Sequence, residues 1–354
     1  MFFSRPSHEQ KIQNCVAQCL AGAFALNAKQ VQSWITVADG KVLITLPFPA
    51  QSQHAQLRTA INTALGEQKL KCDELLMETA VTASPTRLPK INKIKNIIAM
   101  ASGKGGVGKS TTSVNLAFAL IAQGAKVGLL DADIYGPSIP IMLGNTQAKP
   151  ASRDDKTILP LEAHGLVASS IGYFVPAENA TVWRGPMASK ALQQLLNETD
   201  WPELDYLIVD MPPGTGDIQL TLAQNMPVSA AVIITTPQDL ALADARKGIA
   251  MFDKVSVPVL GLIENMSYYL CPHCGHEDHI FAQGGGDRLA TEHKLPLLGQ
   301  LPLNATIRQH ADEGKPLLLE LPDDPLSVAY QQLATAVTKQ LYLNSQDDLR
   351  VLNV

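Results

Sequence analysis

The sequence predicts an α/β protein with a doubly wound, mostly parallel sheet, preceded by a small α+β domain. From Asn96 onward, short apolar runs alternate with helical stretches, the pattern of strands joined by crossover helices. A glycine-rich loop connects the first of these runs to a helix. Residues 82–95 contain two prolines, four Lys or Arg and no acid, which is typical of a linker. We therefore expect domains at 1–81 and 96–343 and a short polar tail at 344–354.

The first domain is expected to combine helices and strands, and its sequence contains no recognisable catalytic motif. Asp39-Gly40 separates two stretches rich in β-forming residues and is a strong hairpin signal. The expected elements are a helix at His8–Asn27, strands at Val31–Val37 and Lys41–Leu46, a helix at Gln51–Leu65 and a strand at Glu74–Val81.

The main domain is expected to place its ligand site where the strands end. In open α/β sheets, ligands bind outside the carboxyl ends of the strands. The expected strands are Asn96–Ala101, Lys126–Leu130, Leu166–Ile171, Tyr206–Val209, Ala230–Thr235 and Val257–Ile263. Helices are expected at Ser113–Gln123, Ser189–Glu198 and Asp239–Lys254.

The composition limits the class of protein. With 354 residues, 46% of them hydrophobic and 17% charged, the chain has enough apolar content for a sizeable core. A net charge of -5 argues against a nucleic-acid or membrane-surface partner, since both usually require basic excess. No apolar run is long enough to span a bilayer, and the first residues lack the apolar core of a signal peptide. Five cysteines in such a chain predict reduced thiols in a cytoplasmic protein.

The glycine-rich loop is the strongest functional signal. Ser102 to Thr111 reads S-G-K-G-G-V-G-K-S-T and fits G-x-x-x-x-G-K-[ST]. Backbone N–H groups of such a loop cradle phosphate oxygens, while Lys109 reaches the β- and γ-phosphates and the Ser110 hydroxyl binds magnesium. The following helix adds its positive dipole end. The loop carries a second lysine, Lys104, directly after its first glycine.

Acidic residues follow two expected strands. Asp131 and Asp133 come after the second strand, where paired carboxylates are able to orient an attacking water and hold the water shell of a metal. Asp210 follows the apolar run Tyr206–Val209, as the aspartate of a Walker B motif does. The Pro-Pro-Gly-Thr-Gly sequence after it suits a loop that senses the γ-phosphate.

A C-P-H-C-G sequence places Cys271 and Cys274 close enough to share one metal. Closed zinc and iron–sulfur sites usually take about four ligands, so this pair is half a site. Histidines at 273, 276 and 279 offer completion within one chain, and a second copy of the two cysteines offers a simpler one. The remaining cysteines, Cys15, Cys19 and Cys72, form no such pair and lie before the linker, and Cys15 and Cys19 are interpreted as buried structural residues.

Two further stretches leave their interpretation open. Asn265 follows an expected strand, where its amide would either pair with an adenine edge or form a turn. The segment Trp183–Met187 reads W-R-G-P-M and suits either a contact loop or an ordinary loop.

Together these motifs resemble a known family. S-G-K-G-G-V-G-K-S-T with two lysines resembles the deviant Walker A motif of the MinD/ParA group of dimerising ATPases. D-A-D-I-Y-G-P-S, W-R-G-P-M, D-M-P-P-G-T-G-D, E-N-M-S and C-P-H-C resemble the Mrp/ApbC branch, the iron–sulfur cluster carriers. The likeness spans Ile97–Leu343. The first eighty or so residues resemble the family's MIP-eighteen-type domain only in position and rough pattern, and Cys72 lies outside any matching motif.

The resemblance implies a P-loop NTPase fold, a slow ATP hydrolase and roles for individual residues. Lys104 would reach the nucleotide of a partner subunit, Asp133 would lie near the hydrolytic water and Asn265 would contact adenine. Asp210 would lie near the Mg²⁺ that Ser110 holds. The residues expected to bind ATP are Gly103, Lys104, Gly105, Gly106, Val107, Gly108, Lys109, Ser110, Thr111, Asp210 and Asn265.

The resemblance also implies a cargo and partners. Cys271 and Cys274 of two subunits would hold one bridging [4Fe–4S] cluster in a homodimer, which would receive it from an assembly scaffold and pass it to apoproteins. A positioning ATPase that works on DNA or membrane is an alternative, disfavoured by the acidic balance and the lack of a basic amphipathic tail. A dimeric ATPase with structural zinc at C-P-H-C is a second alternative, because thiolates suit both metals.

Overall fold

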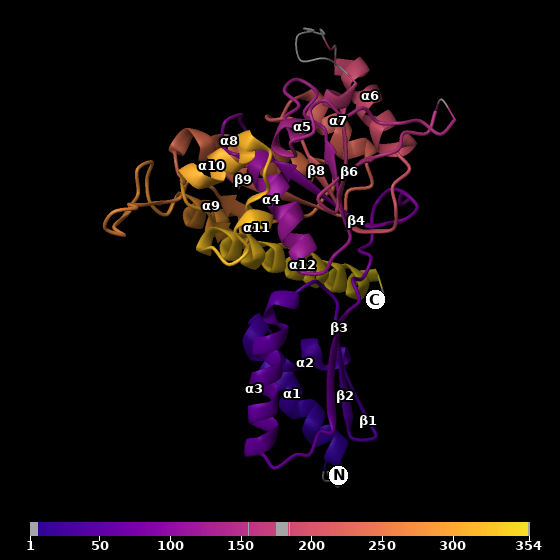
Figure 1. Ribbon diagram of the computed structural model, residues 1–354, viewed down its shortest axis with the longest axis vertical. Coiled ribbons are helices and arrows are strands. Elements are labelled where there is room, and N and C mark those ends of the chain that lie inside the picture. Colours follow the sequence, from indigo (N-terminus) through magenta and orange to yellow (C-terminus); the bar gives the residue numbers. More distant parts are fainter. Residues whose placement is uncertain (1–5, 155, 175–182, 184, 353–354) are drawn as a thin grey trace. The chain divides into compact units, whose positions relative to one another are not determined.

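The computed structural model describes residues 6–154, 156–174, 183 and 185–352, with no side-chain detail beyond residue 346. The chain separates into two compact units, Met1–Thr82 and Ala83–Val354 (Figure 1). Each unit has its own sheet. Among the described residues, no helix is both long and apolar enough to cross a membrane.

The first unit is a three-stranded sheet packed with helices. Strands β1 and β2 are antiparallel, whereas β3 is parallel to β2, which places β2 in the middle. The helices are α1 (His8–Phe24), α2 (Ala28–Val31) and α3 (His54–Glu67), with short 3₁₀ turns at Gln32–Trp34 and Gln51–Gln53. The strands are β1 (Ile35–Ala38), β2 (Lys41–Leu46) and β3 (Glu74–Thr79).

One expected strand of this unit begins later than its sequence suggested. Residues 31–34 are helical, although the sequence predicted a strand from Val31. The reason is local: Asn27 and Gln30 form a reciprocal capping box that starts a helical turn just before this stretch. The expected helix from His8 ends at Phe24, because Ala25 adopts a left-handed cap.

The second unit contains an eight-stranded sheet in the order β13-β10-β9-β4-β8-β5-β7-β6. All its neighbouring strands are parallel except β6 and β7. The central strands are covered on both faces, which explains their nearly continuous apolar sequences. The strands are β4 (Ile94–Ala101), β5 (Val127–Asp131), β6 (Leu161–Ala163), β7 (Leu166–Ser170), β8 (Leu204–Asp210), β9 (Ala230–Thr235), β10 (Val259–Glu264) and β13 (Leu297–Gln300).

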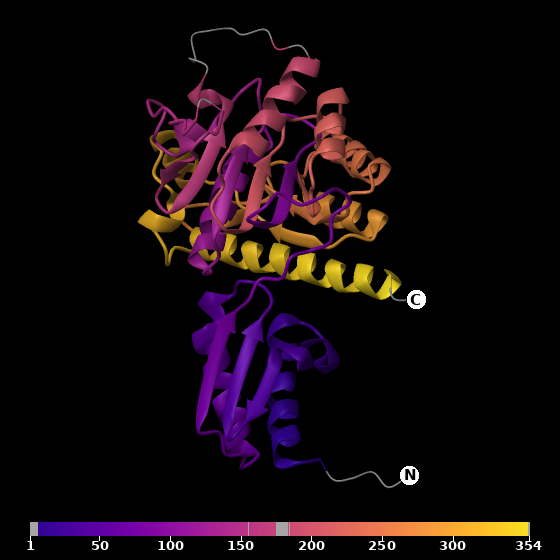
Figure 2. The ribbon, with the colours of Figure 1, turned by 90° about the vertical axis from the view of Figure 1, so that its right-hand side faces the viewer.

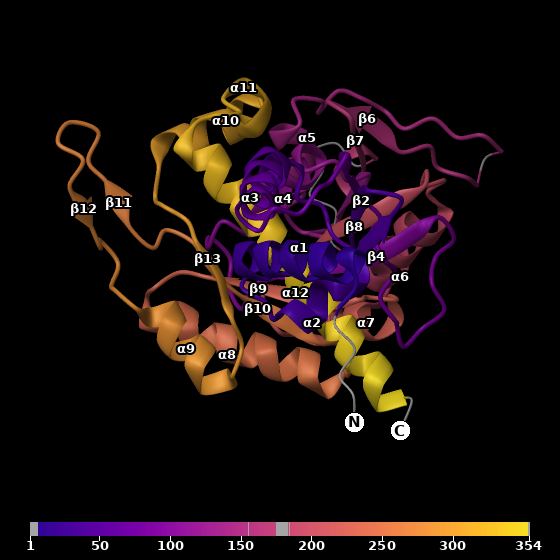
Figure 3. The same ribbon diagram turned by 90° about the horizontal axis from the view of Figure 1, so that it is seen from below.

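Helices cover both faces of this sheet. On one face α4 and α12 pack against each other, and Figure 2 shows the whole length of α12. The opposite layer is a row formed by α6, α7, α8 and α9 (Figure 3). The helices are α4 (Lys109–Ala122), α5 (Ile139–Met142), α6 (Gly185–Glu198), α7 (Asp217–Asn225), α8 (Asp239–Lys254), α9 (Gly285–His293), α10 (Ala305–Glu313), α11 (Leu317–Glu320) and α12 (Pro325–Leu352).

The segments expected as a linker and a tail are part of the second unit. Most of residues 82–95 fall in this unit, and strand β4 already begins at Ile94. Helix α12 continues to Leu352, so residues 344–352 are helical where we expected a tail. The two segments meet, because the buried Ser345 hydroxyl donates to Ser84 Oγ at 2.7 Å. The Ser84 N–H donates to Asn96 Oδ1 at 2.9 Å.

An aromatic cluster provides a test of the first unit. Phe48 is fully buried, with its ring centroid 5.1 Å from Phe24 and 5.6 Å from Trp34. Phe48→Ala removes both edge-to-face contacts and leaves a cavity, which is expected to cost about 3–5 kcal/mol of unfolding free energy. Chemical denaturation followed by tryptophan fluorescence measures this loss. Phe174→Ala is the control, because Phe174 is 46% exposed and its removal should change stability by less than about 0.5 kcal/mol. Equal effects of the two variants would contradict the assignment.

Candidate functional site

The glycine-rich loop joins strand β4 to helix α4, as the sequence predicted. Gly103 lies so close to the Asp244 backbone in α8 that a Cβ there would collide with it. Gly108 has φ = +81°, a left-handed conformation that favours glycine, and it is the N-cap of α4. Helix α4 therefore begins at Lys109, four residues before the helix start expected at Ser113.

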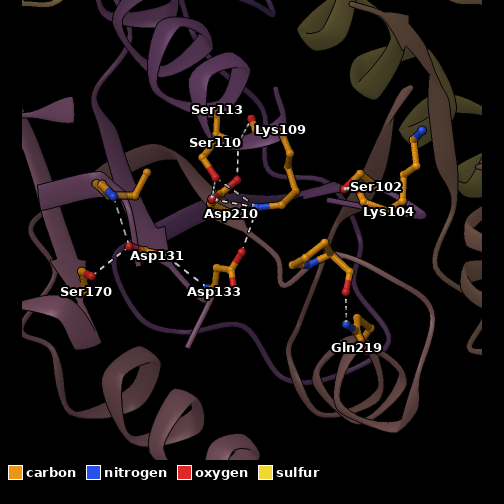
Figure 4. A network of polar contacts seen from close by, with 12 residues as sticks. Ser102, Lys104, Lys109, Ser110, Ser113, Asp131, Asp133, Ser170, Asp210 and Gln219 are labelled. Atoms are coloured by element: carbon orange, nitrogen blue, oxygen red, sulfur yellow. Dashed lines mark hydrogen bonds and ion pairs between the residues drawn. The ribbon is translucent and has the colours of Figure 1, made fainter. Parts of the chain in front are cut away.

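A buried carboxylate at the end of β8 is attached to the start of α4. Asp210 is fully buried and accepts hydrogen bonds from Ser110 Oγ at 2.5 Å and from Ser113 Oγ at 2.7 Å. Lys109 Nζ lies 2.8 Å from Asp210 Oδ2 (Figure 4). The structure thus brings Lys109, Ser110 and Asp210 together. Ser113 was missed, although a hydroxyl three residues after Ser110 lies on the same helix face and is the signal that would have found it.

Two more carboxyl groups follow β5. Asp133 Oδ2 lies 3.9 Å from Lys109 Nζ, and burial raises the pKa of Asp133. Asp131 is fully buried and accepts from Ser170 Oγ at 2.9 Å and from the Asp133 N–H at 3.2 Å. Burial, assisted by the nearby Asp210 carboxylate, raises the pKa of Asp131 to about 7.

A cavity of about 220 Å³ opens over the loop. Backbone N–H groups at a helix start, a lysine and a hydroxyl are the donor set that phosphate and magnesium require. The lining residues are Ser102, Lys104, Gly105, Gly106, Gly108, Lys109, Ser110, Thr111, Asp133, Ser138, Met142 and Pro213. The Gly214 N–H donates to the Ser102 carbonyl at 2.8 Å, which fixes the Pro-Pro-Gly loop beside the cavity.

Lys104 and Asn265 differ in their contacts with the groups around this cavity. The Lys104 side chain points away from the Lys109–Asp210 pair (Figure 4), and within the described residues its ammonium group has no ion-pair partner. Asn265 does not line the cavity; its Nδ2 donates to the Val107 carbonyl at 2.8 Å. An adenine contact of Asn265 stays a prediction.

The C-P-H-C sequence forms the tip of a small hairpin between β11 (Tyr269–Leu270) and β12 (Glu277–Asp278), shown in Figure 3. The Cys271 N–H donates to the His276 carbonyl at 2.9 Å, and the Gly275 N–H donates to the Cys271 carbonyl at 2.9 Å. Cys274 is exposed and Cys271 is partly exposed. Backbone N–H groups of the same turn, first that of His273, lower the pKa of Cys271, which favours the thiolate that binds metal.

The two thiols of the hairpin are not grouped with a third metal-binding side chain in the described structure. Among the residues that the structure describes, no cluster of three or more His, Cys, Asp or Glu side chains forms a metal site. His279 points back to its own hairpin base, with Nδ1 3.1 Å from the Ser267 carbonyl oxygen. The W-R-G-P-M stretch is described only in part, because Arg184 lies outside the described residues.

The strand, loop and helix, with acidic residues at two neighbouring strand ends, define a P-loop nucleotide-binding protein of the MinD/ParA fold. A nucleotide-binding protein from Archaeoglobus fulgidus, solved with ADP, superposes with a TM-score of 0.59 at 36% identity, covering 67% of this chain and 92% of that one. The cell division ATPase MinD of Pyrococcus furiosus superposes with a TM-score of 0.52 at 21% identity, covering 69% and 98%.

The family follows from sequence comparison. The family model described as NUBPL iron-transfer P-loop NTPase, in the ParA group, matches residues 93–338. An iron-sulfur cluster carrier protein of Escherichia coli K12 is 55% identical over 295 residues, covering 79% of this chain and 80% of that protein. An Arabidopsis thaliana iron-sulfur protein required for mitochondrial NADH dehydrogenase is 51% identical over 253 residues, covering 71% and 80%. The chain belongs to the NUBPL iron-transfer P-loop NTPase family, which confirms the resemblance drawn from its motifs.

The raised pKa of Asp131 predicts a pH effect on stability. Between pH 4 and 7 the folded protein holds a proton on Asp131 that the unfolded chain has released, so stability falls as pH rises through this range. Asp131→Asn removes this dependence. Thermal unfolding measures the difference in unfolding free energy between the variant and wild type at pH 5 and at pH 8. This difference should shift in favour of the variant by on the order of 1–4 kcal/mol between pH 5 and pH 8. The same difference between the two proteins at both pH values would contradict the assignment.

Proposed function

We propose that the chain is an ATP-hydrolysing homodimer that carries one [4Fe–4S] cluster between the Cys271 and Cys274 pairs of two protomers. The cluster is then transferred to apoproteins. The observation that carries this proposal is an imbalance within one chain. A single protomer gathers its phosphate-binding groups around one cavity, whereas its hairpin offers two thiols, and no third metal-binding side chain is grouped with them among the described residues.

The phosphate site suits a nucleoside triphosphate with magnesium. Lys109 supplies charge to phosphate oxygens, and Ser110 supplies the hydroxyl that binds Mg²⁺. Asp210 accepts from that hydroxyl, which orients the Ser110 lone pairs toward the cavity. Asp133, at the cavity wall, orients the attacking water. Bound Mg²⁺ would neutralise charge that develops on the phosphate oxygens. The A. fulgidus relative solved with ADP supports nucleotide binding here.

Lys104 gives the reason for a dimer at the phosphate site. The Lys104 side chain points away from the Lys109–Asp210 pair of the same protomer, so its charge is available to a nucleotide in a second protomer. A cation that arrives from a partner stabilises phosphoryl-transfer charge in the way an arginine finger does. The same pairing of protomers would bring four thiols together, which is the number a [4Fe–4S] cluster takes.

The cargo is inferred from thiol chemistry and from the relatives. Thiolates favour soft metals, and the exposed tip of the hairpin lets a bound cluster reach another protein. Several relatives that match most of the chain are called iron-sulfur cluster carrier proteins. Apoproteins that require a cluster are therefore the proposed recipients, and an assembly scaffold is the proposed donor.

Anaerobic reconstitution tests the cluster site. Wild type should take up about four iron per dimer and turn brown, because four thiolates hold one [4Fe–4S] cluster. The Cys271→Ser, Cys274→Ser double variant should take up none, as measured by iron analysis and visible absorption. Cys72→Ser is the matched control and should match wild type. Iron uptake by the double variant, or a colourless wild type that holds zinc, would contradict the cluster assignment.

Alanine variants of Lys109 and Lys104 are expected to lose different parts of the activity. Lys109→Ala should weaken nucleotide binding and abolish hydrolysis, because Lys109 contacts the phosphates of its own subunit. Lys104→Ala should keep nucleotide binding within about threefold but lose at least about 10³-fold in hydrolysis, the effect of removing a trans-acting cation. Equilibrium binding and phosphate release measure these effects. Normal hydrolysis by Lys104→Ala would overturn the role across the dimer.

A further inference from the structure

A buried carboxylate at the end of β10 holds the base of the cysteine hairpin. Glu264 is fully buried, and among the described residues no Lys, Arg or His forms an ion pair with it. Its carboxylate accepts from Ser267 Oγ at 2.7 Å, from Gln300 Nε2 at 3.0 Å and from the Gly286 N–H. A buried carboxyl group needs such hydrogen bonds to replace those it has lost to water, so these donors fix the position of the Glu264 side chain.

Two of the donors lie at the two ends of the cysteine segment, and the third, Gln300, lies on β13. Ser267 is two residues before the hairpin, and Gly286 is in the first turn of α9, which follows it. The Ser267 N–H also donates to the Leu301 carbonyl at 2.9 Å. The chain between these two anchors is mostly exposed. The position of the two thiols therefore depends on the points where this segment leaves and rejoins the sheet.

Asn265, the residue after Glu264, is hydrogen-bonded to the glycine-rich loop at 102–108, here called the phosphate loop. The Asn265 Nδ2 donates to the Val107 carbonyl, and the Asn265 N–H donates to the Thr235 carbonyl, each at 2.8 Å. Met266 has φ = +55°, an uncommon conformation for a side chain of this type, and its Cε lies 3.8 Å from where a Cβ of Gly108 would stand. Because of this turn, Asn265 faces the phosphate loop while Ser267 faces the base of the hairpin.

We infer that Glu264 is a positioning residue for the thiol pair and that residues 264–267 link the phosphate loop to the cysteine hairpin. The inference rests on the proposed function, because it assumes that nucleotide binds at the phosphate loop. A nucleotide that moves the Val107 carbonyl acts on Asn265, and the hydrogen-bonded turn passes this displacement to Glu264 and Ser267. Nucleotide thereby changes the accessibility of Cys271 and Cys274.

Thiol labelling measures this link without iron. Full-length metal-free protein is treated with iodoacetamide, with and without Mg²⁺ and a non-hydrolysable ATP analogue, and labelling rates at each cysteine are read by peptide mass spectrometry. Cys72, in the first unit, is the internal reference. In wild type the analogue should change the Cys271 and Cys274 rates by about fivefold or more, the lower range of site-to-site coupling.

Variants separate positioning from a general structural role. Glu264→Ala should keep nucleotide affinity but lose the response, and Glu264→Gln, which keeps the shape and part of the hydrogen bonding, should restore part of it. Glu277→Ala removes a nearby exposed carboxylate of β12 and should respond as wild type does. Where Glu264→Ala does not fold, Ser267→Ala removes one donor and should diminish the response.

The outcomes distinguish this inference from the proposed function. An unchanged response in Glu264→Ala or Ser267→Ala overturns the inference, as does loss of nucleotide binding in Glu264→Ala, which would assign Glu264 to the nucleotide site. A wild type that assembles a cluster but shows no nucleotide response overturns the inference alone. A wild type that responds, with the response lost in Glu264→Ala, but assembles no cluster overturns the proposed function alone.

Discussion

The contact between Asp210 and the first turn of α4 is the interaction on which the site depends. Strand β8 lies between β4, which leads into the phosphate loop, and β5, which leads to Asp131 and Asp133. Its last residue, fully buried, receives Ser110, Ser113 and Lys109 from α4. One carboxylate thus fixes the helix start against the strand ends. Removing it would leave a buried ammonium group without its nearest partner, which is strongly destabilising.

The two sites differ in how far one chain completes them. The groups that one chain contributes to the phosphate site stand on strand ends and a helix terminus, which hold them at hydrogen-bond distances. The thiol pair stands on a short hairpin whose tip is exposed and which carries no third metal-binding side chain grouped with it among the described residues. A metal shared by two such hairpins would be released when the protomers separate, which suits a cargo better than a permanent cofactor.

Much of this arrangement could be predicted from sequence, because the signals are local. Continuous apolar runs identify strands buried on both faces, and the loop motif fixes both the turn and its chemistry. Glu264 could not be found this way, since its role depends on which chain segments the sheet order brings together. Ser113 carried only a weak signal, its spacing of three residues from Ser110, and its bond to Asp210 depends on the position of β8 beside the start of α4. The helical extension of α12 was missed for a similar reason. Its polar sequence resembles a tail, and Ser345 becomes structural only through its contact with Ser84.

The position of β10 in the sheet explains why nucleotide and thiols would be linked at its end rather than through the core. Strand β10 is separated from β4 by β9, and parallel packed strands resist displacement relative to one another. Glu264 ends this strand, paired with Thr235 of β9 and Gln300 of β13, and residues 265–267 follow it outside the sheet. There, Asn265 bonds to the loop and Glu264 bonds to both ends of the hairpin segment, so consecutive residues contact both sites. A displacement of the loop would then have a short path to the thiols through the residues at the end of this strand.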